Sequence, residues 1–141
     1  MSGRYFLDSN VLLYSFDETD LAKQRAAHAV VREALVSGDG VISYQVVQEV
    51  LNVLMRKLRP GMPPSDAMLY VTTTLEPLWR VQPSSGLFRS ALVLQDRHSF
   101  SWYDALIVSS ALSAGCDRLL TEDMQDGRRV DGLTIENPFR K

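Results

Sequence analysis

Apolar residues in this chain occur both as short runs and as longer stretches with helical spacing. Five short runs predict strands, at residues 5–7, 40–43, 78–81, 118–121 and 133–135. Between them, apolar residues recur at three- and four-residue steps. This spacing predicts helices at 11–14, 21–35, 44–58, 65–75, 84–98 and 102–114, with Ser65 as a possible cap of the fourth.

The predicted strands and helices alternate, and their connections are too long for hairpins. This order predicts an α/β fold with a parallel, twisted sheet of about five strands, flanked by helices on both faces as an α/β/α sandwich. We expect residues 1–141 to form a single domain, because a chain of 141 residues can bury a core without disulfides or metals.

Charge and cysteine content narrow the classes of function. The chain has 15 Lys and Arg against 17 Asp and Glu, a net charge of −2, so it is not a polycation that holds nucleic acid by bulk attraction. We expect a cytoplasmic protein with no membrane contact, because the sequence has neither a signal-peptide pattern nor a long apolar run. Cys116 stands alone and is expected to be a small buried residue.

Several acidic residues fall where an open parallel sheet binds ligands, beyond the carboxyl ends of its strands. Asp8 follows the first predicted strand and Asp123 follows the fourth. Asp104 lies in the first turn of the helix that leads into the fourth strand. Glu49 lies in the middle of a helix, on the rim of its apolar face.

Each of these acids, taken alone, also has a purely structural explanation. Asp8 could cap the helix that follows it, and Asp104 could form a capping box with Ser101. Residues 122–127 could be a polar surface turn, and Glu49 could be a solvated residue on the flank of its helix.

The order of the segments that contain these acids is more informative than any acid alone. The segments are YFLDSN at 5–10, QVVQEV at 45–50, WYDALI at 102–107 and LLTED at 119–123. Together they resemble the four acidic motifs of the PIN-domain ribonucleases, and most closely the VapC-type toxins of bacterial type II toxin–antitoxin modules. The resemblance extends from Tyr5 to Phe139, and no acidic position is substituted.

The resemblance implies a role for each matching residue. The catalytic acids would be Asp8, Glu49, Asp104 and Asp123. Of these, Asp8, Asp104 and Asp123 would contact a metal ion, and Glu49 would orient or deprotonate a metal-bound water. Asn10 and Thr121 would fix the carboxylates or the scissile phosphate, with Asp126 as an additional acid.

A metal ion is also expected on physical grounds. Converging carboxylates repel one another and raise one another's pKa values, so such a cluster needs a cation to neutralise it. Oxygen ligands without Cys or His favour Mg²⁺ or Mn²⁺ over zinc or copper. With such a metal ion, the activity that the resemblance implies is Mg²⁺- or Mn²⁺-dependent endoribonuclease cleavage of RNA phosphodiester bonds.

The resemblance implies further partners, namely a small antitoxin protein that inhibits the enzyme and a second copy of the chain in a homodimer. Candidate phosphate-binding cations are Arg56, Lys57, Arg128 and Arg129. Aromatic residues that could stack on unpaired bases are Trp79, Trp102 and Tyr103, although core packing suits Trp79 better. Apolar residues that could contact the antitoxin, or pack between helices, are Met55, Met62, Met68 and Tyr70.

Three other functions are compatible with the sequence. A PIN-fold nuclease could process RNA without being a toxin. A Mg²⁺-dependent phosphatase of the haloacid dehalogenase kind also places aspartates after strands, but its second Asp would fall at position 10, which is Asn here. A non-catalytic α/β binding module would use the acids only to cap helices.

Overall fold

The computed structural model describes residues 3–140 and contains one six-stranded sheet. The strands are β1 (Arg4–Leu7), β2 (Gly40–Ser43), β3 (Trp79–Val81), β4 (Cys116–Leu120), β5 (Arg129–Val130) and β6 (Leu133–Glu136). They are arranged in the order β3-β2-β1-β4-β6-β5. Every neighbouring pair is parallel except β5 and β6, which are antiparallel.

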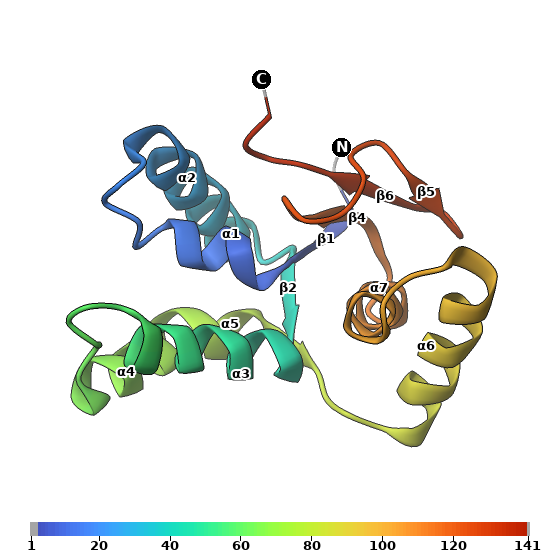
Figure 1. Ribbon diagram of the computed structural model, residues 1–141, viewed down its shortest axis with the longest axis horizontal. Helices are drawn as coiled ribbons and strands as arrows, with labels where there is room; N and C mark the ends of the chain where they lie inside the picture. The colour runs from blue at the N-terminus through green and yellow to red at the C-terminus, as the bar shows by residue number, and fades with distance from the viewer. Residues whose placement is uncertain (1–2, 141) are drawn as a thin grey trace.

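Helices flank this sheet, which confirms the predicted fold class. They are α1 (Ser9–Tyr14), α2 (Leu21–Ser37), α3 (Tyr44–Asn52), α4 (Pro64–Tyr70), α5 (Glu76–Leu78), α6 (Ser85–His98) and α7 (Trp102–Ser113). Figure 1 shows α6 and α7 packed against each other on one side of β2, with α1 and α2 on the other side. None of the helices within residues 3–140 has both the length and the apolar character needed to cross a bilayer.

The order of the strands places a crevice between β1 and β4. The chain runs from β1 to β2 to β3 in one direction and then crosses back to β4 on the far side of β1. Because parallel crossovers are right-handed, this reversal puts the helices before and after it on opposite faces of the sheet. Ligands of open α/β sheets bind at such a reversal, beyond the carboxyl ends of the strands.

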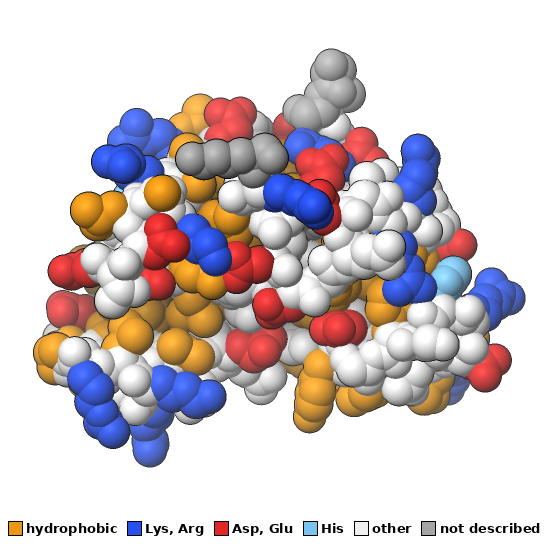
Figure 2. Space-filling view, turned by 45° about the horizontal axis from the view of Figure 1, so that its top comes forward, with side chains coloured by type: hydrophobic (Ala, Val, Ile, Leu, Met, Phe, Trp, Pro, Cys, Tyr) orange, Lys and Arg blue, Asp and Glu red, His pale blue; other side chains and the backbone are white. Residues whose placement is uncertain are grey.

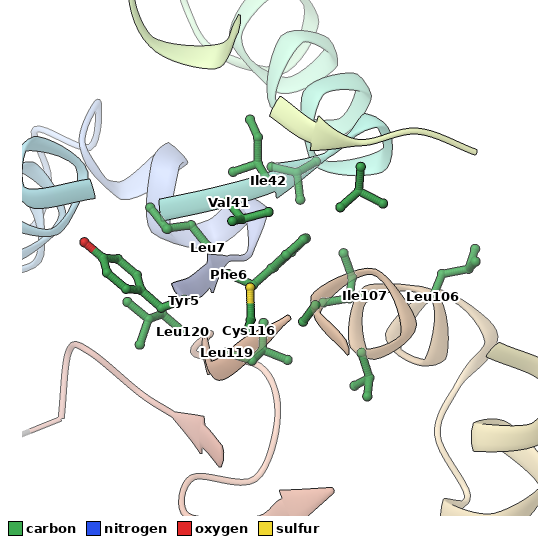
Figure 3. Close-up of a cluster of buried hydrophobic side chains, with 14 of the residues drawn as sticks. Tyr5, Phe6, Leu7, Val41, Ile42, Leu106, Ile107, Cys116, Leu119 and Leu120 are labelled. Atoms are coloured by element: carbon green, nitrogen blue, oxygen red, sulfur yellow. The ribbon is translucent and has the colours of Figure 1, made fainter. Parts of the chain in front are cut away.

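The core lies between the central strands and α7. Phe6, Ile42 and Leu119 are completely or almost completely excluded from solvent, and Figure 3 shows side chains of β1, β2, β4 and α7 meeting in one cluster. Of the two α7 residues labelled in Figure 3, Leu106 and Ile107, Ile107 lies nearer to the strands. Cys116 is a buried free thiol, as predicted.

The observed elements differ from the prediction in three places. The strand β5 was not predicted; it contains two residues and pairs only with β6. The predicted helix 44–58 ends in a π-helical turn, η1 (Val53–Lys57), and the predicted helix 65–75 contains another, η2 (Val71–Leu75), and continues into α5. Ser65 does not cap α4, because that helix begins one residue earlier, at Pro64, where proline is favoured.

A close approach between α2 and β2 gives a test of the packing. A Cβ atom on Gly40 would lie 2.3 Å from the Cβ of Ala34 and 3.0 Å from its Cα. We therefore expect Gly40→Ala to lower the free energy of unfolding by about 1–3 kcal/mol, the usual cost of overpacking. Urea denaturation followed by circular dichroism measures this change.

Gly86 in α6 provides the matched control for this substitution. A Cβ atom there meets only the Ser84 Oγ, at 4.0 Å. Gly86→Ala should be neutral or should stabilise the protein by up to about 1 kcal/mol, because alanine suits a helix better than glycine. Equal effects of the two substitutions would contradict the predicted clash at Gly40.

Candidate active site

Asp8 lies at the point where β1 meets β4. Its backbone N–H donates to the Leu120 carbonyl at 3.0 Å, one residue beyond the last residue of β1. One carboxylate oxygen accepts from the Ser9 N–H at 2.8 Å and caps α1, as the structural explanation predicted. The other accepts from the Thr121 hydroxyl at 2.9 Å. The side chain is only 7% exposed, which a simple helix cap does not require.

Asn10 and Thr121 link Asp8 to the loop that contains Asp123. The Asn10 amide donates to the Thr121 Oγ1 at 3.2 Å and to an Asp123 carboxylate oxygen at 3.0 Å. The Thr121 hydroxyl oxygen also accepts from the Asp123 N–H at 3.1 Å. The amide oxygen of Asn10 accepts from the Glu122 N–H at 3.2 Å. These bonds fix the side chains at the carboxyl ends of β1 and β4 relative to one another.

Asp104 and Glu49 reach the same place from two helices. The Asp104 N–H donates to the Ser101 Oγ at 3.2 Å, so Ser101 caps α7, and the Asp104 side chain is partly exposed. Glu49 is on the exposed side of α3. Figure 2 shows Asp and Glu side chains near the middle of this face of the molecule, while Lys and Arg lie mainly towards its edges.

The pKa values show that the four carboxylates interact. Burial raises the pKa of Asp8 to about 6, and the charges of Asp123 and Asp104 add to the rise. Loss of hydration raises the pKa of Glu49, to which the charges of Asp8 and Asp104 contribute. The pKa of Asp104 is also raised, first by loss of hydration and then by the charge of Asp123. The four acids that the sequence singled out therefore lie close enough for charge to act between them.

Glu122 lies next to Asp123 but faces away from this cluster. Its carboxylate accepts from the Tyr14 hydroxyl at 2.5 Å and forms an ion pair with Lys23, whose ammonium group lies 4.6 Å from the centre of the Tyr14 ring. The hydrogen bonds from Lys23 and Tyr14 lower the pKa of Glu122. This contact joins α1 and α2 to the loop that contains Asp123, and no motif in the sequence indicated it.

Two other predicted residues have contacts outside the cluster. The Asp126 carboxylate accepts from the Asn137 N–H at 2.8 Å and from Arg140 at 3.3 Å, so it holds the loop against residues 137–140. Arg128 donates to the His98 carbonyl at 2.8 Å and lies over the Phe100 ring. Arg56, Lys57 and Arg129 remain exposed. The role of these four cations in phosphate binding stays a prediction.

The donor set of the cluster fits a hard divalent cation. Within residues 3–140, no three His, Cys, Asp or Glu side chains already stand close enough together to form a ligand cage. Mg²⁺ does not require one, because it keeps several waters and binds through one or two carboxylates. The burial of Asp8 and the mutual repulsion of the acids make such a cation favourable, since it would neutralise the charges that raise their pKa values.

A groove of about 930 Å³ opens beside this cluster. Asn10 and Asp123 line one end, and residues 58–63 line the other. Apolar side chains, including Phe16 and Met62, line part of its wall. The wall also contains five acidic residues and one arginine, namely Asp17, Glu18, Asp66, Glu122, Asp123 and Arg59. The groove is therefore both apolar and acidic.

The buried charge of Asp8 leads to a prediction about stability. The folded state binds more protons at Asp8 than the unfolded state between about pH 4 and pH 6, so this residue lowers stability as the pH rises through that window. Without metal at about pH 7, Asp8→Asn should raise the free energy of unfolding by about 1–3 kcal/mol, and the gain should shrink towards pH 4. Urea denaturation across this pH range measures it.

Asp96→Asn on the exposed side of α6 is the matched control, because it removes the same charge from a solvated position. It should leave the free energy of unfolding within about 0.5 kcal/mol of the wild type at every pH. A gain for Asp8→Asn that did not change with pH would contradict an origin in the Asp8 charge.

The contact between Lys23 and Glu122 leads to a second prediction. Lys23→Met removes the cation that holds the Glu122 carboxylate, so the loop that contains Asp123 should open more often. Hydrogen exchange should then be faster at the Glu122 and Asp123 amides, which bond to Asn10 and Thr121. Lys23→Arg keeps the charge and should show smaller changes. Unchanged exchange in Lys23→Met would contradict this role.

Comparisons with known proteins agree with this geometry. Solved structures with similar folds include FitAB bound to an IR36 DNA fragment (TM-score 0.69, 14% identity, 97% of this chain and 96% of that chain covered). A toxin–antitoxin complex from Klebsiella pneumoniae has a TM-score of 0.65 at 18% identity, over 95% of this chain and 97% of that one. VapC20 of Mycobacterium tuberculosis, a toxin that cleaves the sarcin–ricin loop, has a TM-score of 0.59 at 21% identity, over 82% and 86%.

These identities are low, so the structural likeness concerns the fold. No curated protein matches the chain. The sequence model of the PIN domain matches residues 5–133, which include all four acids and the polar residues that connect them. The chain therefore belongs to the PIN domain family.

Proposed function

We propose that this protein is a Mg²⁺- or Mn²⁺-dependent endoribonuclease and the toxin of a toxin–antitoxin pair. The observation that carries the proposal is that carboxylates from four separate segments of a PIN domain lie near the carboxyl ends of β1 and β4. The fold is shared with solved toxin–antitoxin complexes, which supports the biological part of the proposal.

The acids of the cluster have different tasks in this proposal. Asp8, Asp104 and Asp123 would hold the cation, which when bound polarises a phosphodiester and a water molecule. Glu49 is exposed, and loss of hydration together with the charges of Asp8 and Asp104 raises its pKa, which suits a group that accepts the proton of the attacking water. Asn10 and Thr121 hold Asp8 and Asp123 in place through the hydrogen bonds described above.

The RNA would reach this cluster along α3. Arg56 follows Glu49 by about two turns along α3 and η1, and both side chains are exposed. Arg56 and Lys57 are exposed and form no ion pair within residues 3–140. Their charges are therefore available to phosphates.

The antitoxin would occupy the groove beside the cluster. Its acidic wall repels RNA phosphates, whereas its apolar and acidic side chains together suit a protein segment with apolar and basic residues. Such a segment would block access to Asp123 and Asn10, which line the groove. The homodimer that the resemblance implies stays a prediction, which sedimentation of the purified protein tests.

Cleavage of labelled single-stranded RNA tests the enzymatic proposal. The wild type should cut in Mg²⁺ or Mn²⁺, stop in chelator and leave a linear phosphate end, because water is the nucleophile. Glu49→Gln should lower kcat by about 10²- to 10⁴-fold and keep the thermal shift caused by Mn²⁺. Asp104→Asn should lose both cleavage and the shift.

Asp126→Asn is the control, because its carboxylate contacts Asn137 and Arg140 instead of the cluster. It should cut RNA like the wild type. A cyclic phosphate end, or cleavage that persists in chelator, would refute the proposed chemistry. Absence of a small antitoxin gene beside this one would instead favour a PIN-fold nuclease that processes RNA.

A further inference from the structure

Tyr103 is an exposed aromatic residue next to the cluster, and the mechanism above does not use it. Its side chain is 67% exposed, whereas the other tyrosines and both tryptophans, all within the described residues, are buried or half-buried. Within that part of the chain its ring has no aromatic partner; the neighbouring Trp102 ring packs on Phe88 instead. The ring is therefore available to an external ligand.

The position of Tyr103 in α7 directs it towards the site. It is the second residue of that helix, and helical side chains lean towards the helix N-terminus. Its ring is therefore expected to extend beyond the first turn of α7. The next residue is Asp104, one of the four acids of the cluster.

The backbone of Tyr103 is held although its side chain is free. The Gln45 amide of α3 donates to the Tyr103 carbonyl at 3.4 Å, and Ser101 caps the first turn of α7. Gln45 lies one helical turn before Glu49 in α3, so this bond connects Tyr103 to the helix that contains Glu49. An exposed ring on a fixed backbone loses little freedom when a planar ligand stacks on it.

We propose that Tyr103 binds an unpaired nucleobase of the RNA strand by stacking and so positions the neighbouring phosphate at the carboxylates. This inference rests on the proposed endoribonuclease function. Asp123 and Asn10 line the acidic groove, whereas Tyr103 does not line it and directly precedes Asp104 in α7. Stacking is tolerant of base identity because every base has a π-face, but it requires a base free of a duplex.

Binding without cleavage tests the stacking directly. A single-stranded RNA containing 2-aminopurine is titrated with Asp8→Asn, which is expected to bind RNA without cutting it. Asp8→Asn should quench the fluorescence of one 2-aminopurine position as the base stacks. Adding Tyr103→Leu should abolish that quenching and weaken binding by about 5- to 150-fold, the range for one stacked base.

Two further variants separate stacking from other effects. Tyr103→Phe keeps the ring and should retain both quenching and affinity. Leu92→Ala removes an apolar side chain that is 55% exposed on α6 and should change neither. In the active protein, Tyr103→Leu should raise KM for single-stranded RNA more than it lowers kcat, and it should preserve the thermal shift caused by Mn²⁺.

The outcomes distinguish this inference from the function on which it rests. If Asp8→Asn binds no RNA and the wild type cuts none, the proposed function fails. If the wild type cuts RNA but Tyr103→Leu binds and cuts equally well, only the role of Tyr103 is refuted. If Tyr103→Leu changes the sedimentation of the protein and not its affinity for RNA, the ring belongs to a contact between two copies of the chain.

Discussion

The pairing of β1 with β4 is the contact on which the candidate site depends. It brings residues 8 and 121 together, although they are 113 positions apart in the chain. The Thr121 hydroxyl then donates a hydrogen bond to the Asp8 carboxylate. Asn10 and Asp123 meet only because those two strand ends are adjacent. Asp104 is positioned by α7, which packs against β4 and β2, and Glu49 by α3, which packs against β2 and β3.

The carboxylates of the candidate site lower the stability of the folded state. A buried carboxylate surrounded by other carboxylates destabilises the native state, and the hydrogen bonds from Ser9 and Thr121 offset only part of that cost. The apolar cluster around Phe6 and Leu119 must therefore be stable enough to hold Asp8 in place. A cation would reverse the sign of this interaction, because the same charges that repel one another would attract it.

The sequence predicts those parts of the molecule that depend on local pattern. Periodicity locates the five longer strands and most helices, and the position of an acid directly after a strand locates Asp8 and Asp123. Contacts between distant side chains are not encoded locally. Glu122 and Asp123 are adjacent acids, and only the packed structure shows that one pairs with Lys23, 99 residues away, while the other joins the cluster. The same holds for Arg128 and for β5, whose two residues are ordered by pairing with β6.

The central place of β1 also constrains the order in which the chain can fold. This strand precedes the other strands of the sheet in the chain, yet its second neighbour, β4, is separated from it by more than a hundred residues. Contacts of such long sequence separation form slowly, because the intervening chain must be closed into a loop. Until then one edge of an almost wholly apolar strand stays unpaired and open to association with other chains. Incomplete chains of this protein are therefore expected to associate more readily than the complete chain.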